Sequence, residues 1–270
     1  MLHSALLNVM IKAARQAGRT LKRDFGEVER LQVSVKGPGN FVTAADNRSE
    51  KILREELAKA RPGYSFLGEE GGRTDGSDKT HTWIVDPLDG TTNFLHGIPQ
   101  FAISIALQRN DTIVAAVIYN PATDELFTAE RGKGAFLNDQ RQRDQRLRVA
   151  ARTSLADSVI ACGLPHRGRG DLALNRREMA AVQERVAGLR RFGAAALDLA
   201  WVAAGRFDGF WERDLQPWDT AAGLLLVREA GGFATDPSGG DGVLTKGSVV
   251  AGNEAVHREL LALLQKAEKA

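Results

Sequence analysis

Two long apolar segments joined by a short polar turn indicate which kind of sheet the first half of this chain can form. The segments FAISIALQ and TIVAAVIY are separated only by RND, which has the length and composition of a hairpin turn. Further short apolar segments and turns follow, through LFTAE and GAFLN. Such a succession is a β-meander, and it predicts an antiparallel sheet in this half, after helices near the N-terminus and at about 45–60.

Helical and strand patterns alternate in the second half, from SVIACG to the last helix, EAVHRELLALLQKAEK. This alternation predicts a layered α/β arrangement. The arginine-rich segment QRQRDQRLR separates the two patterns. We therefore expect an α+β fold with an N-terminal subdomain at 1–145, which holds the antiparallel sheet, and a C-terminal subdomain at 146–270.

Charge and cysteine content restrict the partners and the compartment. Lys plus Arg number 36 and Asp plus Glu number 34, so the net charge of +2 gives no reason to expect nucleic acid or an anionic membrane as the main partner. The single cysteine excludes an internal disulfide, and the N-terminus lacks the order of a signal peptide. We expect a soluble cytoplasmic protein without a membrane span.

The stretch WIVDPLDGTTNF places two acids at the end of an apolar strand. Buried carboxylates are costly unless they are compensated. Pro87 disfavours helix at Asp86, so we expect the strand to stop there and turn. The turn can bring the carboxylates of Asp86 and Asp89 and the carbonyl of Leu88 toward one point, which is a site for a hard cation such as Mg²⁺.

The residues after these acids, Gly90-Thr91-Thr92, can open a helix whose free N–H groups and hydroxyls suit a phosphate or an activated water. Two more acid-bearing segments stand beside glycine or a helix start. They are GEEGG, with Glu69 and Glu70, and PWDTAAG, with Asp219. Metal ligands next to an anion-binding turn are what metal-assisted phosphoryl transfer requires.

Each candidate also has a purely structural interpretation. Asp86 can end a strand, and Asp89 can cap a helix. Asp219 has the position of an N-cap, and Asp46 that of the acid in a capping box. Glu69, Glu70 and Lys36 can be solvated loop residues. Taken one at a time, these positions leave both interpretations open.

The combination of GEE, DPLDGTTNF and a distant PWD closely resembles the inositol monophosphatase family, the Mg²⁺-dependent, lithium-sensitive phosphatases. The resemblance extends from Lys36 in VKGPGN to PWDTAAG, and RRFGAAALDLAWVAAGRFDGFWE is similar to the bacterial-type branch. It implies a layered α-β-α-β-α sandwich of the inositol monophosphatase and fructose-bisphosphatase type, and a homodimer.

The resemblance also implies two to three Mg²⁺ ions. The first would lie between Glu69, Asp86 and the Leu88 carbonyl. The second would bind Asp86, Asp89 and Asp219, and a weaker third would lie near Glu69 and be held largely by water. Asp86 would then bridge two cations, which would offset the cost of its burial.

Catalytic and substrate roles follow from the same resemblance. Glu69 and Thr91 would orient the attacking water, Asp46 would hydrogen-bond Thr91, and Lys36 would lie on a mobile loop. The N–H groups of Gly90 and Thr91 would hold the phosphate. The polyol would be bound by the Glu212 carboxylate, the Ala195 backbone, the backbone at Gly193, and Asp219.

The implied reaction is hydrolysis of a phosphate monoester, with myo-inositol 1-phosphate as substrate. The same chemistry could act on fructose 1,6-bisphosphate, NADP or an adenosine bisphosphate, with the loop of His166, Arg167 and Arg169 facing the second phosphate instead of solvent. A role of another class is association with the transcription machinery through QRQRDQRLR and Arg190-Arg191. The low net charge favours a solvated surface there.

Overall fold

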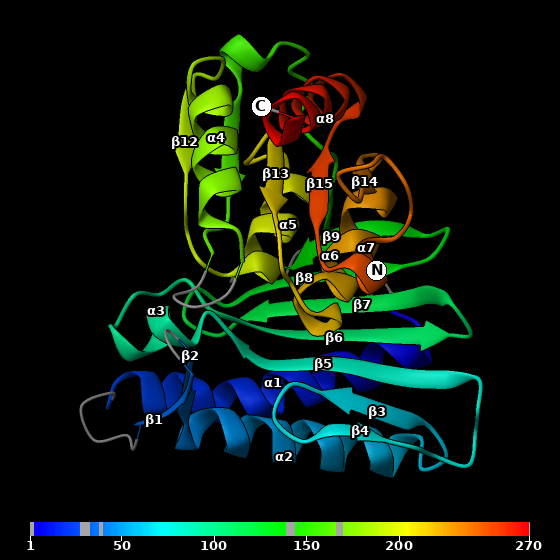
Figure 1. Ribbon diagram of the computed structural model, residues 1–270. Helices are drawn as coiled ribbons and strands as arrows, with labels where there is room; N and C mark the ends of the chain where they lie inside the picture. Colours follow the sequence, from blue (N-terminus) through cyan, green and yellow to red (C-terminus); the bar gives the residue numbers. More distant parts are fainter. Residues whose placement is uncertain (1–2, 28–32, 38–39, 139–143, 166–169, 270) are drawn as a thin grey trace.

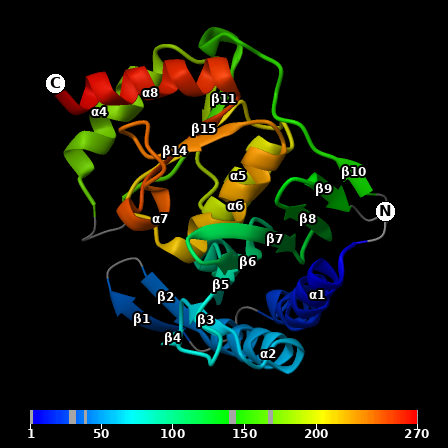
Figure 2. The same ribbon diagram turned by 90° about the vertical axis from the view of Figure 1, so that its right-hand side faces the viewer.

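The computed structural model describes residues 3–27, 33–37, 40–138, 144–165 and 170–269, with 33–37 and 40–43 described by their backbone only. Its helices and sheets are stacked in layers (Figures 1 and 2). From bottom to top of Figure 2 these are a helix pair, an eight-stranded sheet, a second helix pair, a five-stranded sheet and a third helix pair. The predicted α-β-α-β-α sandwich is thereby confirmed.

The eight-stranded sheet has the order β10-β9-β8-β7-β6-β5-β3-β4. All neighbours are antiparallel except β3 and β5, which are parallel. The predicted antiparallel sheet is correct for the meander and wrong at this pair, because β4 folds back along the outer edge of β3 before β5 begins. The strands are β3 (Ser65–Gly68), β4 (Gly72–Thr74), β5 (His81–Asp89), β6 (Ala102–Arg109), β7 (Thr112–Asn120), β8 (Glu125–Glu130), β9 (Gly134–Asn138) and β10 (Asp144–Arg146).

The five-stranded sheet has the order β12-β11-β13-β15-β14. Strand β11 is parallel to both of its neighbours, and the remaining pairs are antiparallel. Its strands are β11 (Val159–Cys162), β12 (Gly188–Arg190), β13 (Gly209–Glu212), β14 (Phe233–Thr235) and β15 (Val249–Gly252). A separate antiparallel ribbon is formed by β1 (Val33–Gly37) and β2 (Asn40–Thr43).

The helices cover both faces of each sheet. Helices α1 and α2 pack below the large sheet, α5 and α6 lie between the sheets, and α4 and α8 cover the small sheet (Figure 1). Within the described residues, no helix has the length and apolar character needed to traverse a bilayer. The helices are α1 (Ala5–Phe25), α2 (Ala44–Ala60), α3 (Thr91–Leu95), the 3₁₀ turn η2 (Leu155–Asp157), α4 (Leu172–Gln183), α5 (Ala195–Ala203), α6 (Pro217–Glu229), α7 (Val243–Lys246) and α8 (Glu254–Lys269).

The position of each helix follows from its apolar pattern. Helix α1 buries only one face, so its apolar residues recur at helical spacing, and Ser4 caps its first turn by accepting the Leu7 N–H. Helices α5 and α6 are apolar nearly all round because they contact sheets on both sides. These two helices therefore hold the two sheets together. The subdomain boundary at residue 145 remains a prediction.

Candidate metal centre

The end of strand β5 forms the centre of the site. The strand continues to Asp89, so the prediction that it stops at Asp86 is wrong. Its register with β6 shifts between Asp86 and Asp89, which places a β-bulge at Pro87 and Leu88. Pro87 has no N–H for the ladder, and a bulge accommodates such a residue. Because the bulge interrupts the strand's alternation, Asp86, Leu88 and Asp89 all line the same cavity.

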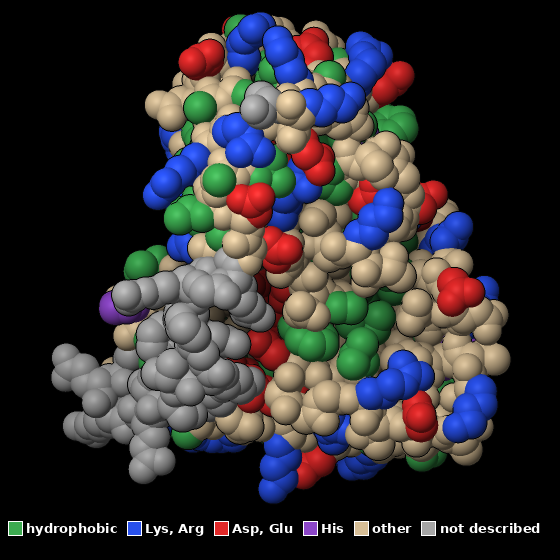
Figure 3. Space-filling model, viewed as in Figure 1, with side chains coloured by type: hydrophobic (Ala, Val, Ile, Leu, Met, Phe, Trp, Pro, Cys, Tyr) green, Lys and Arg blue, Asp and Glu red, His purple; other side chains and the backbone are tan. Residues whose placement is uncertain are grey.

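This cavity has a volume of about 310 Å³ and contains nearly all of the predicted site residues. Figure 3 shows acidic side chains gathered in a cleft at the middle of the molecule's face. The segments that meet there come from β5, α5, β13 and α6, so the site joins both halves of the chain. The predicted residues that line it are Glu69, Asp86, Leu88, Asp89, Gly90, Thr91, Gly193, Ala195, Glu212 and Asp219.

The two acids of β5 are buried close to other negative charges. Asp86 is 2% exposed and Asp89 is 9% exposed. Burial raises the pKa of Asp86 well above its usual value, and the charge of Glu69 raises it further. Burial and the charge of Asp219 raise the pKa of Asp89 in the same way, although Asp89 accepts a 2.8 Å hydrogen bond from the Ala196 N–H. The cavity floor therefore disfavours its own negative charge.

Two further acids influence the cavity: Glu212 lines it, and Asp198 lies near enough to raise the pKa of Glu212. Burial, and then the charge of Asp198, raise the pKa of the half-buried Glu212. Asp198 on α5 is fully buried, and within the described residues neither of its carboxylate oxygens has a hydrogen-bond partner. Burial raises the pKa of Asp198 to about 8, against the opposing effect of Arg191. Asp198 was not predicted as a site residue, although an acid within the apolar run LDLAW was a signal for it.

Asp219 enters the site from the first turn of α6. The helix begins at Pro217, so Asp219 is its third residue and Gln216 is the N-cap. The N-cap interpretation of Asp219 is therefore wrong in its position. One carboxylate oxygen accepts the Gln216 N–H at 2.7 Å in a capping box, and the residue also lines the cavity.

The turn after β5 places Thr91 over the Leu88 carbonyl. Gly90 has a φ of 87°, and a Cβ there would lie 2.8 Å from the Gln100 carbonyl oxygen, so the turn requires glycine. The Thr91 hydroxyl lies 3.0 Å from the Leu88 carbonyl oxygen and 3.5 Å from Asp46 Oδ2. Asp46 is buried behind Thr91 and does not line the cavity.

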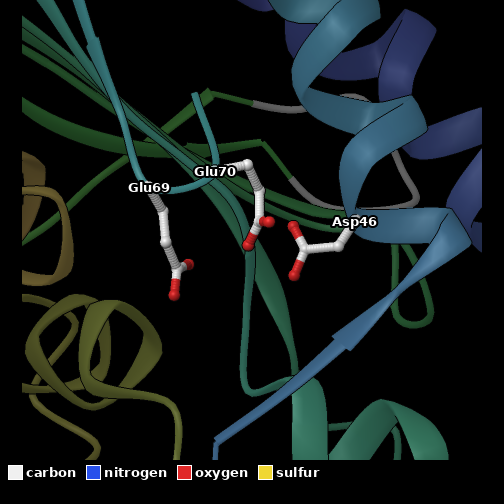
Figure 4. A group of neighbouring side chains, drawn as sticks. All are labelled: Asp46, Glu69 and Glu70. Carbon is white, nitrogen blue, oxygen red and sulfur yellow. The ribbon is translucent and has the colours of Figure 1, made fainter. Parts of the chain in front are cut away.

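A second group of carboxylates lies beside the first. Oxygen atoms of Asp46, Glu69 and Glu70 lie within 4.8 Å of one another, a spacing that allows them to hold a metal ion. Figure 4 shows the carboxylates of Asp46 and Glu70 pointing toward each other. Glu70 was recognised from the sequence only as the second acid of GEEGG and was not predicted as a metal ligand.

The donor set fits a hard divalent cation. All the candidate ligands offer carboxylate or carbonyl oxygen, which Mg²⁺, Ca²⁺ and Mn²⁺ prefer. Among the described residues that line the cavity, the cationic side chains are Arg191 and Arg213, and Arg213 is already paired with Glu178 and Glu268. The acids of the cavity floor are therefore not balanced by these two arginines.

Two predicted features lie outside what the structure describes. Lys36 belongs to strand β1, but its side chain is outside the described residues. The loop of His166, Arg167 and Arg169 is outside them as well. Their proposed roles stay predictions.

Proteins from other bacteria match this chain over nearly its whole length. A protein from Mesorhizobium japonicum, "Inositol-1-monophosphatase", is 62% identical over 266 residues, and the match covers 98% of this chain and 98% of that protein. A protein from Pseudomonas aeruginosa, "Nus factor SuhB", is 43% identical, with 96% of each chain covered. The crystal structure of "extragenic suppressor protein suhB" from Bartonella henselae has a TM-score of 0.92 and 57% identity, covering 97% of this chain and 99% of that one.

The sandwich, the carboxylate-lined cavity and these relatives define the molecule as a phosphatase of a metal-dependent class. A model of the inositol monophosphatase family matches residues 3–269, and the chain belongs to that family. The family predicted from DPLDGTTNF and PWDTAAG is thereby confirmed.

Proposed function

We propose that this protein hydrolyses phosphate monoesters with Mg²⁺, and that myo-inositol 1-phosphate is its main substrate. The observation that carries the proposal is the burial of Asp86 and Asp89 side by side on the cavity floor, with the pKa of each raised by burial and by neighbouring acids. Such a floor is stabilised by bound cations. The name of the Mesorhizobium japonicum relative supports the choice of substrate.

The residues would hold two to three Mg²⁺ ions. Glu69, Asp86 and the Leu88 carbonyl would form the first position, and Asp86, Asp89 and Asp219 the second. Bound cations would supply Lewis-acid activation of water and would neutralise the charge that develops on the phosphate and the leaving oxygen. Since all five residues line one cavity, a single substrate can reach both positions.

The remaining residues would orient the reactants. Glu69 and the Thr91 hydroxyl orient the attacking water, with Asp46 behind Thr91. The N–H groups of Gly90 and Thr91 hold the phosphate in line for attack. On the opposite wall, the Glu212 carboxylate accepts hydrogen bonds from substrate hydroxyls.

The shape of the wall supports a polyol leaving group. Gly193 and Ala195 present backbone beside Glu212, and the cavity of about 310 Å³ has room for a six-carbon ring and one phosphate. Arg191 lies on the same wall, so it is a candidate contact for a second anionic group. This is why bisphosphates remain the alternative substrates.

A substrate panel with and without Mg²⁺ tests the proposal. We expect inositol 1-phosphate to give a higher kcat/KM than fructose 1,6-bisphosphate, NADP or an adenosine bisphosphate, and millimolar Li⁺ to inhibit. Faster hydrolysis of a bisphosphate would change the substrate and keep the chemistry. No Mg²⁺-dependent phosphate release from any sugar or polyol phosphate would refute the proposal.

We also propose that the protein is a cytoplasmic homodimer. A second candidate function, association with the transcription machinery, is supported by the name of the Pseudomonas aeruginosa relative. A salt-sensitive pulldown of RNA polymerase factors with the wild type and with an inactive Asp89→Asn variant tests it. Capture by both proteins supports a binding role that is independent of catalysis, and capture by neither contradicts it.

A further inference from the structure

A buried carboxylate outside the proposed mechanism holds the turn that carries Glu69. Glu50 lies on α2 and is 5% exposed. Its two carboxylate oxygens each accept a backbone hydrogen bond, one from the Glu70 N–H at 2.8 Å and one from the Gly71 N–H at 2.9 Å. Hydrogen bonds to an ionised carboxylate are stronger than those between neutral groups. Glu50 therefore fixes the backbone immediately after Glu69.

The glycines of GEEGG leave room for this carboxylate. A Cβ on Gly71 would lie 2.7 Å from Glu50 Oε1, and a Cβ on Gly68 would lie 2.5 Å from Glu50 Oε2. Both distances are shorter than contacts of real Cβ atoms. The turn can approach α2 this closely only because side chains are absent at both positions.

The same face of α2 holds the β5 bulge. Ser49 is fully buried, and its hydroxyl donates to the Pro87 carbonyl oxygen at 2.8 Å. Asp46, three and four residues before these two, reaches toward Thr91. Residues at this spacing lie on one helix face. One buried polar face of α2 therefore contacts two of the three backbone segments that carry the proposed metal ligands, the Glu69 turn and the β5 bulge.

We propose that Glu50 is a positioning residue that sets the cation affinity of the first metal position. It anchors the Glu69–Gly71 turn to α2, so that Glu69 stays beside Asp86 without the help of a bound ion. The Glu69 N–H also donates to the Val85 carbonyl oxygen at 3.3 Å, which ties the other end of the turn to β5. This inference rests on the proposed function, because it assigns Glu69 to a metal.

Glu50→Gln tests the proposal, because an amide keeps the shape of the side chain but can accept only one of the two N–H bonds. Free Mn²⁺ measured by electron paramagnetic resonance without substrate gives the affinity directly. We expect the Mn²⁺ affinity to fall by about 10–100-fold, as for other outer ligand contacts. The Mg²⁺ concentration for half-maximal phosphate release should rise by a similar factor, with kcat largely recovered at saturating Mg²⁺. The exposed Glu55→Gln on the same helix is the matched control and should bind Mn²⁺ like the wild type.

Gly71→Ala disturbs the same contact from the side of the turn and should give the same loss of Mn²⁺ affinity. It also serves as the measurement if Glu50→Gln does not fold. A role in general stability alone predicts a lower melting temperature with unchanged Mn²⁺ affinity. That result in both variants would overturn the proposal.

The wild type separates this inference from the proposed function. If the wild type binds Mn²⁺ and hydrolyses inositol 1-phosphate while both variants match it, only the role of Glu50 is overturned. If the wild type neither binds Mn²⁺ nor releases phosphate, the proposed function fails and the role of Glu50 fails with it.

Discussion

The burial of Asp86 and Asp89 destabilises the metal-free fold but favours the proposed reaction. Their burial among other acids destabilises the metal-free protein, since a charged carboxylate is least stable where water is excluded. The same burial gives a bound cation strong, poorly screened interactions. Burial that destabilises the metal-free fold but strengthens cation binding is expected of metal ligands. It is not expected of carboxylates that only stabilise the fold.

Asp89→Asn should therefore inactivate the enzyme without unfolding it. The amide oxygen can still accept the Ala196 N–H, so the main-chain contact survives. We expect kcat/KM to fall by more than the roughly 10–100-fold typical of residues outside the ligand set, and the metal-free melting temperature to stay equal or rise. Phosphate release and thermal unfolding of the same preparation check this. Normal turnover would refute Asp89 as a ligand.

The raised pKa of Asp198 predicts that the stability of the folded protein depends on pH. Its pKa is about 8 in the folded protein and 3.8 as a free side chain, so between these values the folded protein holds a proton that the unfolded chain loses. The stability of the wild type should fall as pH rises through this window. Asp198→Asn should flatten the fall and melt at a higher temperature than the wild type at about pH 8, with little difference at about pH 4.

Thermal unfolding at several pH values without Mg²⁺ measures this effect. Asp111→Asn, at an exposed acid in a hairpin turn, is the control and should follow the wild type. An Asp198→Asn variant whose stability keeps the wild-type slope would contradict the account of this residue.

At the scale of elements, the site depends on how strands, turns and helices are joined. Asn93 on α3 donates to the carbonyl oxygens of Gln100 and Phe192, both at 2.7 Å. The second bond connects the segment after β5 to the loop in which Gly193 lines the cavity, where the substrate wall is proposed. A single side-chain amide therefore links the proposed phosphate side of the cavity to the proposed polyol side.

Asn93→Ala should cost about 1–3 kcal/mol of unfolding free energy, because it removes the donor from the buried Gln100 carbonyl and the partly buried Phe192 carbonyl. It should also raise KM for the polyol phosphate more than it lowers kcat, since the wall at Gly193 loses its support. Urea unfolding and steady-state kinetics measure the two effects. Asn8→Ala on the exposed face of α1 is the control, and equal effects from both variants would contradict the role of Asn93.

The sequence predicted the helices and strands better than it predicted how they pair and contact one another. The strand ending in Asp86 was recognised by its apolar run and by Pro87. Its continuation to Asp89 was not, because a β-bulge depends on pairing with the distant β6. The helical spacing of Ser49 and Glu50 from Asp46 was a signal that these polar residues share one face of the helix. Their partners lie 20 to 38 residues away, so no local pattern identifies the contacts.

At the scale of the whole molecule, the order of layers was predictable and the parallel pair of β3 and β5 was not. The meander and the later alternation of helices and strands indicate two sheets and their helices. The parallel pair depends on β4 occupying the outer edge of β3, which is a matter of space and not of composition. The motifs predicted residues that line one cavity, whereas Asp198, an acid within an apolar run, was a signal that was not used.

Metal binding should stabilise the whole molecule and should do so more at high pH. Because the pKa values of Asp86 and Asp89 are raised, protons compete with cations for these carboxylates as pH falls. At a Mg²⁺ concentration of about 100 times its dissociation constant, the folded state should gain roughly 2.7 kcal/mol. Calorimetric melting with and without Mg²⁺ should show a larger increase at about pH 8 than at about pH 5. An increase that does not change with pH would contradict this linkage.

We propose that the acids of the cavity floor hold the cations of a phosphatase. Anomalous diffraction from crystals soaked in Mn²⁺ tests this proposal. We expect a peak between Glu69, Asp86 and the Leu88 carbonyl, and a second peak in contact with Asp86, Asp89 and Asp219. Crystals at saturating Mn²⁺ with no peak at these residues would contradict it.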